Sequence, residues 1–455
     1  MIRDFDYLHN TFLISRHSIP AMGLFTDIKD QILEKTKDSR GEFFWFLLGQ
    51  FSILISNFIV VRMLTKAGKE EFGFYTLVLT VSAFLSYIYY GPAQQSFMKF
   101  YFMADGEGEK GLFTRLMSRF IVKSTLLLGL LTIGISSFLP GLTGLEFSSL
   151  IVAALFIVTA KYTEFFNSAF NILRRRKLNS ILQFSERLLL ILLIIILTVS
   201  GKISIITALL LMASINIVFA ITKNIIFARN TEGENPAADY KKLASKHTNR
   251  IRGYSIPFVI WGLSGWLQLN SEKWMMANLL SLENVGVYGV MAVIVNMFVA
   301  IPANILSEFI SPVVFANYSD PANAERVKKG KLYIMITFFS VVVIAAVSVL
   351  LSWAGGEWII RLFSSGSYVS YAYLLPLFVI GAGLFNSGQA LTMEGLALNN
   401  PRAYLAPKIL GGIAALAANY YFISSYGLPG AAYASLFAGA FYLLYILFVN
   451  TRLSR

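Results

Sequence analysis

The sequence predicts an all-α, polytopic membrane protein of about twelve transmembrane helices, and three observations lead to this prediction. Hydrophobic residues make up 56% of the chain and charged residues only 14%, whereas soluble domains average about 25% charged residues. Apolar stretches of roughly 20 residues, enough to cross a bilayer as a helix, recur between Gly41 and Asn450. The stretches are continuous, as in residues 188–197, whereas barrel strands would alternate in segments of about ten residues.

The predicted spans follow one another across short polar joints. Backbone groups find no hydrogen-bond partner in lipid, so each apolar run is expected to form a helix. The eighth span is long, and Pro302 within it predicts a break. The expected helices cover residues 41–64, 73–97, 116–138, 148–172, 178–200, 203–226, 253–279, 285–316, 331–353, 369–392, 403–424 and 428–450.

Composition also excludes several classes of function. The absence of cysteine excludes disulfides, thiol catalysis and cysteine-ligated metal. His9, His17 and His247 all fall outside the predicted spans, which excludes a histidine metal site in the membrane. No P-loop, nucleotide-sugar or catalytic-triad motif is present, so we expect neither an enzyme nor a cofactor. The net charge of +13 fits basic cytoplasmic loops better than nucleic-acid binding.

The charges of the joints predict how the chain is oriented. One set of joints is rich in Lys and Arg, as in residues 174–177, 229–250 and 326–331. The joints on the other side are poorer in basic residues, and residues 139–148 contain none. The positive-inside rule then places both termini in the cytoplasm. We therefore expect a multi-pass membrane protein.

The first 40 residues lack the features of a cleavable signal peptide. Met1 and Met22 are both compatible with the start of translation. Apolar residues recur here at helical spacing opposite charged residues, which predicts an amphipathic helix on the cytoplasmic membrane surface. The apolar residues are Leu24, Phe25, Ile28, Ile32 and Leu33.

Two short motifs recur in the two halves of the chain and predict an internal duplication. Residues 71–75 (EFGFY) open the second span, and residues 284–288 (NVGVY) open the eighth, with Gly73 and Gly286 213 residues apart. The sequence Phe-Asn-Ser occurs at residues 166–168 and again at residues 385–387. Six helices per half predict two lobes related by a parallel repeat around a central cavity, with the substrate near the bilayer midplane. The expected segments are 1–40 (N-terminal segment), 41–229 (first lobe), 230–250 (linker), 251–450 (second lobe) and 451–455 (tail).

Basic residues inside the spans are the main candidates for substrate binding. An ionisable residue at depth costs a few kcal/mol and is a functional candidate by default, and Lys and Arg bind phosphate groups. Lys223 and Arg252 lie near span ends and are expected to extend to the membrane surface. The deeper candidates come from five helices and both halves: Lys123, Lys161, Arg187, Lys273 and Lys408.

Acidic residues in the spans leave two interpretations open. Glu164 follows Lys161 by three residues, so an internal ion pair competes with a role in substrate binding. Glu164 and Glu272 are also candidates for ion coupling.

The seventh span is the most polar, and it carries candidates for sugar binding. Trp261 and Gln268 share one helical face, and Trp266 and Asn270 share another. Aromatic rings stack on the apolar faces of sugars, and amides bind their hydroxyls. The alternative for the tryptophans is anchoring at the membrane interface.

Three junctions resemble those of polysaccharide exporters. Residues 61–64 (VRML), then Gly68 and residues 72–75 (FGFY), are similar to the junction between helices one and two of that family. Residues 269–274 (LNSEKW) and 285–288 (VGVY) resemble the equivalent junction of the second lobe, with Glu272 where aspartate is commoner. Residues 426–432 (YGLPGAA) resemble the last loop. The resemblance covers nearly the whole chain from Gly41 and is to the Wzx-type O-antigen and polysaccharide flippases, of the superfamily that also contains multidrug extruders and lipid II flippases.

The resemblance implies a function, a substrate and partners. It implies movement of an undecaprenyl-pyrophosphate-linked oligosaccharide across the bacterial cytoplasmic (inner) membrane by alternating access. It also adds Arg62 to the substrate-binding candidates. Membrane lipids, a polysaccharide polymerase and a chain-length regulator would be its partners. The alternative is an ion-coupled multidrug antiporter of the same superfamily, which would more naturally carry deep acids without matching bases. The energy source and the identity of the sugars stay open.

Overall fold

The computed structural model describes residues 40–136, 147–173, 175–229, 240–318 and 323–453. These residues form helices joined by short turns, with no strand among them. Nine of the helices in these ranges are long and apolar enough to cross a membrane by themselves. The predicted all-α membrane architecture is therefore confirmed. The predicted amphipathic N-terminal helix lies outside the described residues.

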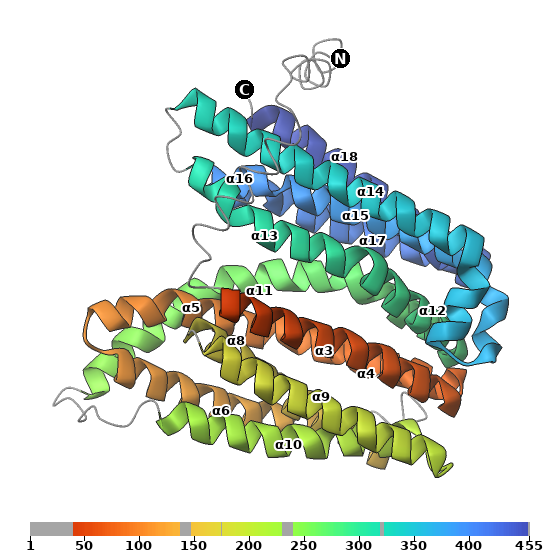
Figure 1. The fold of residues 1–455 in the computed structure, drawn as a ribbon, viewed down its shortest axis with the longest axis horizontal. Coiled ribbons are helices and arrows are strands. Elements are labelled where there is room, and N and C mark those ends of the chain that lie inside the picture. The colour runs from red at the N-terminus through yellow and green to blue at the C-terminus, as the bar shows by residue number, and fades with distance from the viewer. Residues whose placement is uncertain (1–39, 137–146, 174, 230–239, 319–322, 454–455) are drawn as a thin grey trace.

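The first half of the chain forms one lobe, drawn in red to yellow-green in Figure 1. Gly68 separates its first two long helices in a backbone conformation (φ 119°) that strongly favours glycine. The helices are α3 (Arg40–Leu64), α4 (Lys69–Leu85), α5 (Gly91–Gly106), α6 (Lys110–Ser136), α8 (Phe147–Ile172), α9 (Arg176–Val199) and α10 (Ile205–Arg229).

The second half forms the other lobe, and its first helix, α11, runs between the two lobes (Figure 1). The helix α11 begins at Tyr240, inside the segment predicted as linker, and α14 continues to Phe363 through a kink at Gly355. The helices are α11 (Tyr240–Leu279), α12 (Leu282–Val295), α13 (Ile301–Tyr318), α14 (Ala324–Phe363), η5 (Gly366–Leu374), α15 (Leu375–Leu391), α16 (Met393–Ala397), η6 (Pro401–Tyr404), α17 (Leu405–Tyr426) and α18 (Leu428–Leu453).

The same irregularity interrupts one long helix in each lobe. A π-helical turn, Asn296–Ala300, separates α12 from α13 immediately before Pro302, so the predicted break is confirmed. A matching π-helical turn, Ser86–Tyr90, separates α4 from α5 before Pro92. Proline has no N–H to donate to the preceding turn, which widens the helix at both places.

The repeated glycine motif marks the place where the lobes meet. A Cβ atom on Gly73 would lie 1.9 Å from the carbonyl oxygen of Leu282, and one on Gly286 would lie 2.0 Å from the carbonyl oxygen of Lys69. Because these neighbours are backbone atoms, no side chain fits at either position. The two glycines let α4 and α12 pack backbone against backbone at the boundary between the lobes.

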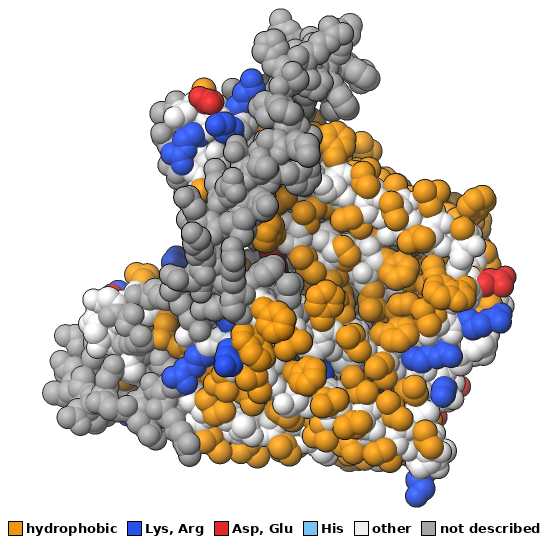
Figure 2. Space-filling model, viewed as in Figure 1, with side chains coloured by type: hydrophobic (Ala, Val, Ile, Leu, Met, Phe, Trp, Pro, Cys, Tyr) orange, Lys and Arg blue, Asp and Glu red, His pale blue; other side chains and the backbone are white. Residues whose placement is uncertain are grey.

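The surface fits a membrane environment. Figure 2 shows apolar side chains across the middle of the visible face, with Lys and Arg side chains toward its edges. Large apolar residues on the surface include Leu130 (68% exposed), Leu350 (63%) and Ile196 (62%). Exposed apolar patches of this extent are rare in soluble monomers, and in lipid they carry no hydrophobic penalty.

Candidate functional site between the lobes

One end of the boundary between the lobes is held shut by hydrogen bonds, and we call it the closed end. The guanidinium of Arg62, at the end of α3, donates to the carbonyl oxygens of Arg361 and Ser364. The backbone N–H of Ser365 donates to the hydroxyl of Thr65 at 3.2 Å. Further contacts join Tyr368 to the Gly68 carbonyl oxygen (3.4 Å) and Lys69 to Glu283 (2.8 Å). Arg62, predicted to bind substrate, thus joins the lobes in this conformation.

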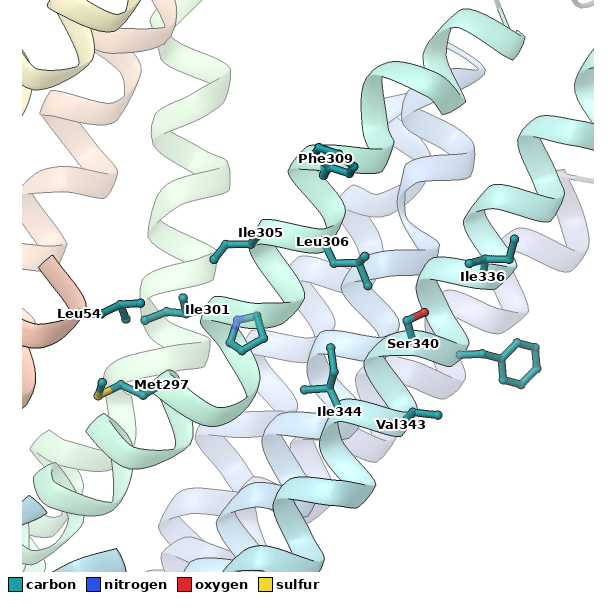
Figure 3. A pocket seen from close by; sticks show the side chains of 12 residues that line it. Leu54, Met297, Ile301, Ile305, Leu306, Phe309, Ile336, Ser340, Val343 and Ile344 are labelled. Carbon is teal, nitrogen blue, oxygen red and sulfur yellow. The ribbon is translucent and has the colours of Figure 1, made fainter. Parts of the chain in front are cut away.

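Away from the closed end, the ribbons of α3 and α13 diverge (Figure 1). A groove of about 860 Å³ lies along α13 and α14 and reaches Leu54 of α3. Figure 3 shows Leu306 and Ser340 between the two helices, and Ile301 and Ile305 on the side of Leu54. Eleven of its twelve lining residues are apolar and the other is Ser340: Leu54, Met297, Ile301, Pro302, Ile305, Leu306, Phe309, Ile336, Phe339, Ser340, Val343 and Ile344. No sequence motif indicated this groove.

Two of the five predicted cations are paired with a neighbouring acid on their own helix. Lys161 lies 2.5 Å from Glu164, which confirms the ion pair considered above. Lys273 lies 2.8 Å from Glu272, and Tyr288 donates to the same carboxylate oxygen at 2.9 Å. Both candidate ion-coupling acids, Glu164 and Glu272, therefore have their charge compensated in this conformation.

The prediction that Lys223 extends to the membrane surface is wrong. Its side chain is 0% exposed, and its ammonium lies 2.7 Å from Glu186 of α9. A buried ammonium is stable in such a place only when it is paired. The acid that satisfies it comes from a neighbouring helix, which sequence spacing does not reveal.

Arg187 and Lys123 form no ion pair with any carboxylate in the described ranges. Arg187 is half-buried on α9, one residue after Glu186, and Lys123 is exposed on α6. These two side chains are the predicted cations with the fewest competing interactions.

Lys408 and Gln268 lie inside the second lobe. Lys408 is 8% exposed and Gln268 7%. The ammonium of Lys408 lies 5.2 Å from the ring centre of Tyr442 and 5.5 Å from that of Phe385. Aromatic faces at this range offset part of the cost of burying a cation. Neither side chain is freely accessible to a large ligand in this conformation.

The tryptophans of α11 contact α4 of the first lobe. The indole N–H of Trp266 donates to the carbonyl oxygen of Thr80 at 2.8 Å, and that of Trp274 donates to the Thr80 hydroxyl at 2.9 Å. Asn270 is 9% exposed and accepts a hydrogen bond from Lys273 at 3.2 Å. The side chain of Trp261 lies outside the described residues. Sequence reasoning missed Thr80, a lone threonine in an apolar run.

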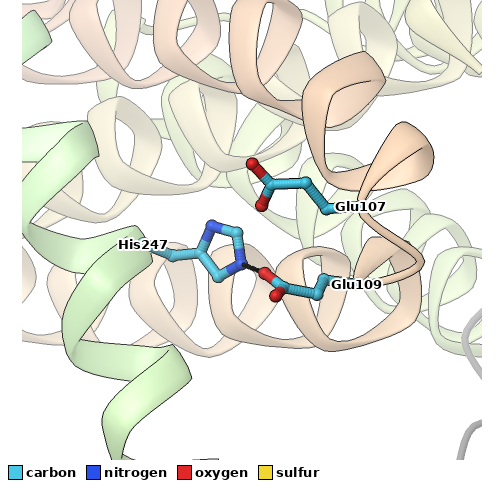
Figure 4. Close-up of side chains that lie close together, drawn as sticks. All are labelled: Glu107, Glu109 and His247. Carbon is cyan, nitrogen blue, oxygen red and sulfur yellow. Dashed lines mark hydrogen bonds and ion pairs between the residues drawn. The ribbon is translucent and has the colours of Figure 1, made fainter.

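A charged cluster, here called the clasp, joins the start of α11 to the turn between α5 and α6. Lys246 lies 2.7 Å from Glu107 and 3.1 Å from Glu109, and Arg250 lies 3.0 Å from Glu107. His247 lies 2.8 Å from Glu109, with Glu107 nearby (Figure 4). Lys246 and Arg250 lower the pKa of Glu107 to about 2. Two acids and one histidine resemble a metal site, but Lys246 and Arg250 already neutralise both carboxylates, so a divalent cation would be repelled.

Comparison with known proteins gives a fold but no close relative. No protein-family model and no curated protein matches the chain. Among solved structures, the lipid II flippase MurJ in an inward closed conformation aligns with a TM-score of 0.64 and 15% identity, over 90% of this chain and 86% of that chain. An inward-facing multidrug resistance MATE transporter of the MOP superfamily aligns with a TM-score of 0.67 and 13% identity, over 89% and 94% of the two chains.

A third structure, a mutant of the Vibrio cholerae MATE transporter VcmN, aligns with a TM-score of 0.64 and 13% identity, over 94% of this chain and 97% of that chain. All these alignments span nearly the whole length of both chains. Identities this low establish the fold without establishing the substrate. The protein therefore has the fold of the membrane transporters of the MOP superfamily.

Proposed function

We propose that the protein flips an undecaprenyl-pyrophosphate-linked oligosaccharide across the cytoplasmic membrane by alternating access. The observation that carries the proposal is the apolar groove along α13 and α14, beside the boundary between the lobes. A small hydrophilic substrate has no use for such a groove, whereas a polyprenyl chain gains by staying against apolar side chains. Likeness to MurJ in fold supports a lipid-linked substrate.

The diphosphate of such a substrate requires cations that are not already neutralised. Arg187 and Lys123 meet this condition among the described residues, whereas Lys161 and Lys273 each have an adjacent acid. A guanidinium binds phosphate through two parallel hydrogen bonds. We therefore infer that Arg187 makes the larger contribution and Lys123 the smaller, with Asn270 and Trp266 of α11 binding the sugars.

The proposed direction of transport follows from the charges at the two ends. Because α14 ends at the closed end, its start, with Arg326, Lys328 and Lys329, lies at the diverging end. If Lys and Arg mark the cytoplasmic side, this conformation admits substrate from the cytoplasmic leaflet. The closed end then faces the periplasm.

A multidrug antiporter is the second candidate, because buried Glu272 and the MATE-like fold would suit a cationic drug. The carboxylate of Glu272 already accepts hydrogen bonds from Lys273 and Tyr288. A drug cation would have to displace both donors, which favours the flippase.

Deletion of the gene distinguishes the two candidates in a host that makes a lipid-linked surface glycan. We expect glycan display to stop and the precursor to stay on the cytoplasmic leaflet. Unchanged display together with new sensitivity to cationic dyes would contradict the flippase and support the antiporter.

A further inference from the structure

A cluster of three charged side chains in the first lobe contains one more base than acid. The ammonium of Lys223 (α10) lies 2.7 Å from the carboxylate of Glu186 (α9), and the two side chains are 0% and 7% exposed. Arg187 follows Glu186 in the sequence and is half-buried, and its charge acts on Lys223. One carboxylate and two bases therefore leave an excess of one positive charge inside an apolar lobe.

The helix α11 shows what an acid does when no base from another helix pairs with it. Glu272 and Lys273 are also neighbours in the sequence, and their charged groups lie 2.8 Å apart. Within the described ranges, the donor that reaches Glu272 from another helix is the neutral hydroxyl of Tyr288. An acid of this chain can therefore neutralise the base that follows it on the same helix.

Glu186 has a basic partner from another helix, and this changes the state of the base that follows it. Lys223 comes from α10, and its buried ammonium forms an ion pair with no other carboxylate among the described residues. A buried ammonium is stable only when an acid compensates it, and the ring of Phe219, 5.9 Å away, offers a weaker contact. Glu186 is therefore held by Lys223, and Arg187 stays without an ion pair in the part of the chain that the structure describes.

We propose that Lys223 is a positioning residue that keeps Arg187 free to bind the diphosphate of the substrate. The inference rests on the proposed function, in which Arg187 is the main ligand of the diphosphate. Without Lys223, Glu186 would pair with Arg187, as the acid of α11 pairs with its neighbour. With Lys223 in place, an anion that reaches the guanidinium meets a net positive charge and has no carboxylate to displace.

Binding of farnesyl diphosphate to the purified full chain tests this role, with farnesol as the matched probe that lacks the diphosphate. Lys223→Met should weaken binding by about tenfold or more, because Glu186 then pairs with Arg187. Glu186→Gln leaves Lys223 without its partner instead, and should bind at least as tightly as the wild type. Both variants break the same buried ion pair and should lower the Tm, so a purely structural role predicts weaker binding in both.

A double variant and a surface control complete the series. Lys223→Met combined with Glu186→Gln removes both charges of the pair and leaves Arg187 unpaired, so it should restore most of the affinity. Lys202→Met, at an exposed joint, should match the wild type. If Lys223→Met does not fold, Glu186→Gln and the double variant decide.

The outcomes separate this inference from the proposed function. If Arg187→Ala abolishes the binding of farnesyl diphosphate but Lys223→Met binds it as the wild type does, or Glu186→Gln binds it more weakly, this inference alone is overturned. If the wild type does not prefer farnesyl diphosphate to farnesol, or Arg187→Ala binds it as tightly as the wild type, the assignment of the diphosphate to Arg187 is wrong and this inference is overturned with it.

Discussion

The contacts at the two ends of the boundary between the lobes differ in their chemistry. At the closed end, α4 and α12 touch through their backbones at Gly73 and Gly286. At the other end, the start of α11 is joined to the first lobe by the side chains of the clasp. Water and ions replace exposed charged contacts at little cost. Water and ions cannot replace close backbone packing. The closed end therefore depends on an exact fit of the two helices, whereas the clasp depends on charge.

This difference indicates which contacts must break when the two lobes change their relative orientation. The clasp residues Glu107, Lys246 and Arg250 are about one third exposed, and ion pairs of this kind contribute little stability. Arg62, by contrast, spans from α3 to two carbonyl groups of the other lobe. Reversal of the conformation requires the closed end to lose these specific contacts. The closed end should therefore set the balance between the two conformations.

The largest effect is expected from Gly286→Ala. The added Cβ would lie 2.0 Å from the Lys69 carbonyl oxygen, so α4 and α12 must separate, and overpacking of this kind costs about 1–3 kcal/mol. The chain has no cysteine, so Thr65→Cys and Ser365→Cys can report closure by disulfide formation. Cross-linking should fall by about tenfold.

The matched control for this prediction is Gly265→Ala, because no atom beyond its own turn of α11 lies within 4 Å of the position its Cβ would take. This variant should cross-link as the unsubstituted pair does. Unchanged cross-linking in Gly286→Ala would show that the glycine contact does not determine closure.

A smaller effect is expected from Arg62→Ala. Loss of hydrogen bonds from a charged donor should weaken the closed end by about 1–2 kcal/mol. Arg62→Lys should restore only part of this stability, because lysine lacks the planar guanidinium that donates to both carbonyl groups. Spin labels at the exposed positions Lys66 and Ser367 would report a larger population of long distances. If export is lost while the distance distribution is unchanged, Arg62 binds substrate and does not hold the lobes together.

The smallest effect is expected at the clasp. The basic neighbours lower the pKa of Glu107 from 4.5 to about 2. A lowered pKa means that the contribution of Glu107 is present above pH 4.5 and is lost as the pH falls through about 2. The contribution of Glu107 to the clasp should therefore be unchanged between pH 7 and pH 5, whereas Glu107→Gln should weaken the clasp at neutral pH.

Proteolysis or hydrogen exchange at the start of α11 would measure this weakening. Added salt should loosen the wild-type clasp more than the Glu107→Gln clasp, because screening acts on the charges that the variant lacks. Equal protection of both proteins at low and high salt would show that packing, and not charge, holds this end.

The helices were predictable from the sequence, whereas most partners of the site residues were not. Apolar runs and Pro302 are local signals, and they gave the spans and the break before α13. The first three turns of α11 were missed because they are polar. The pairing of Lys223 with Glu186 joins two helices, 37 residues apart in sequence. Lys161 and Glu164 share one helix, so their pair could be predicted.

The internal repeat also shows that the sequence predicts elements better than it predicts their contacts. The glycines of the repeated motif could be recognised as equivalent, but their contact with the opposite backbone depends on how the lobes meet. Thr80 and the groove beside Leu54 carry no motif, because a small residue acquires its role only from what packs against it. The five cations were chosen by depth alone, and the structure separates them into paired, buried and unpaired side chains.

Reconstituted flipping of a fluorescent undecaprenyl-diphosphate oligosaccharide tests the central claim most directly. Proteoliposomes with the wild-type protein should move the label between leaflets faster than protein-free liposomes. Arg187→Ala should reduce the rate by about tenfold to 150-fold, the effect of about 1.5–3 kcal/mol for a charge-assisted hydrogen bond. Arg187→Lys should retain more activity, and Lys202→Ala, at an exposed joint, should match the wild type. A wild-type rate equal to that of protein-free liposomes would contradict the account.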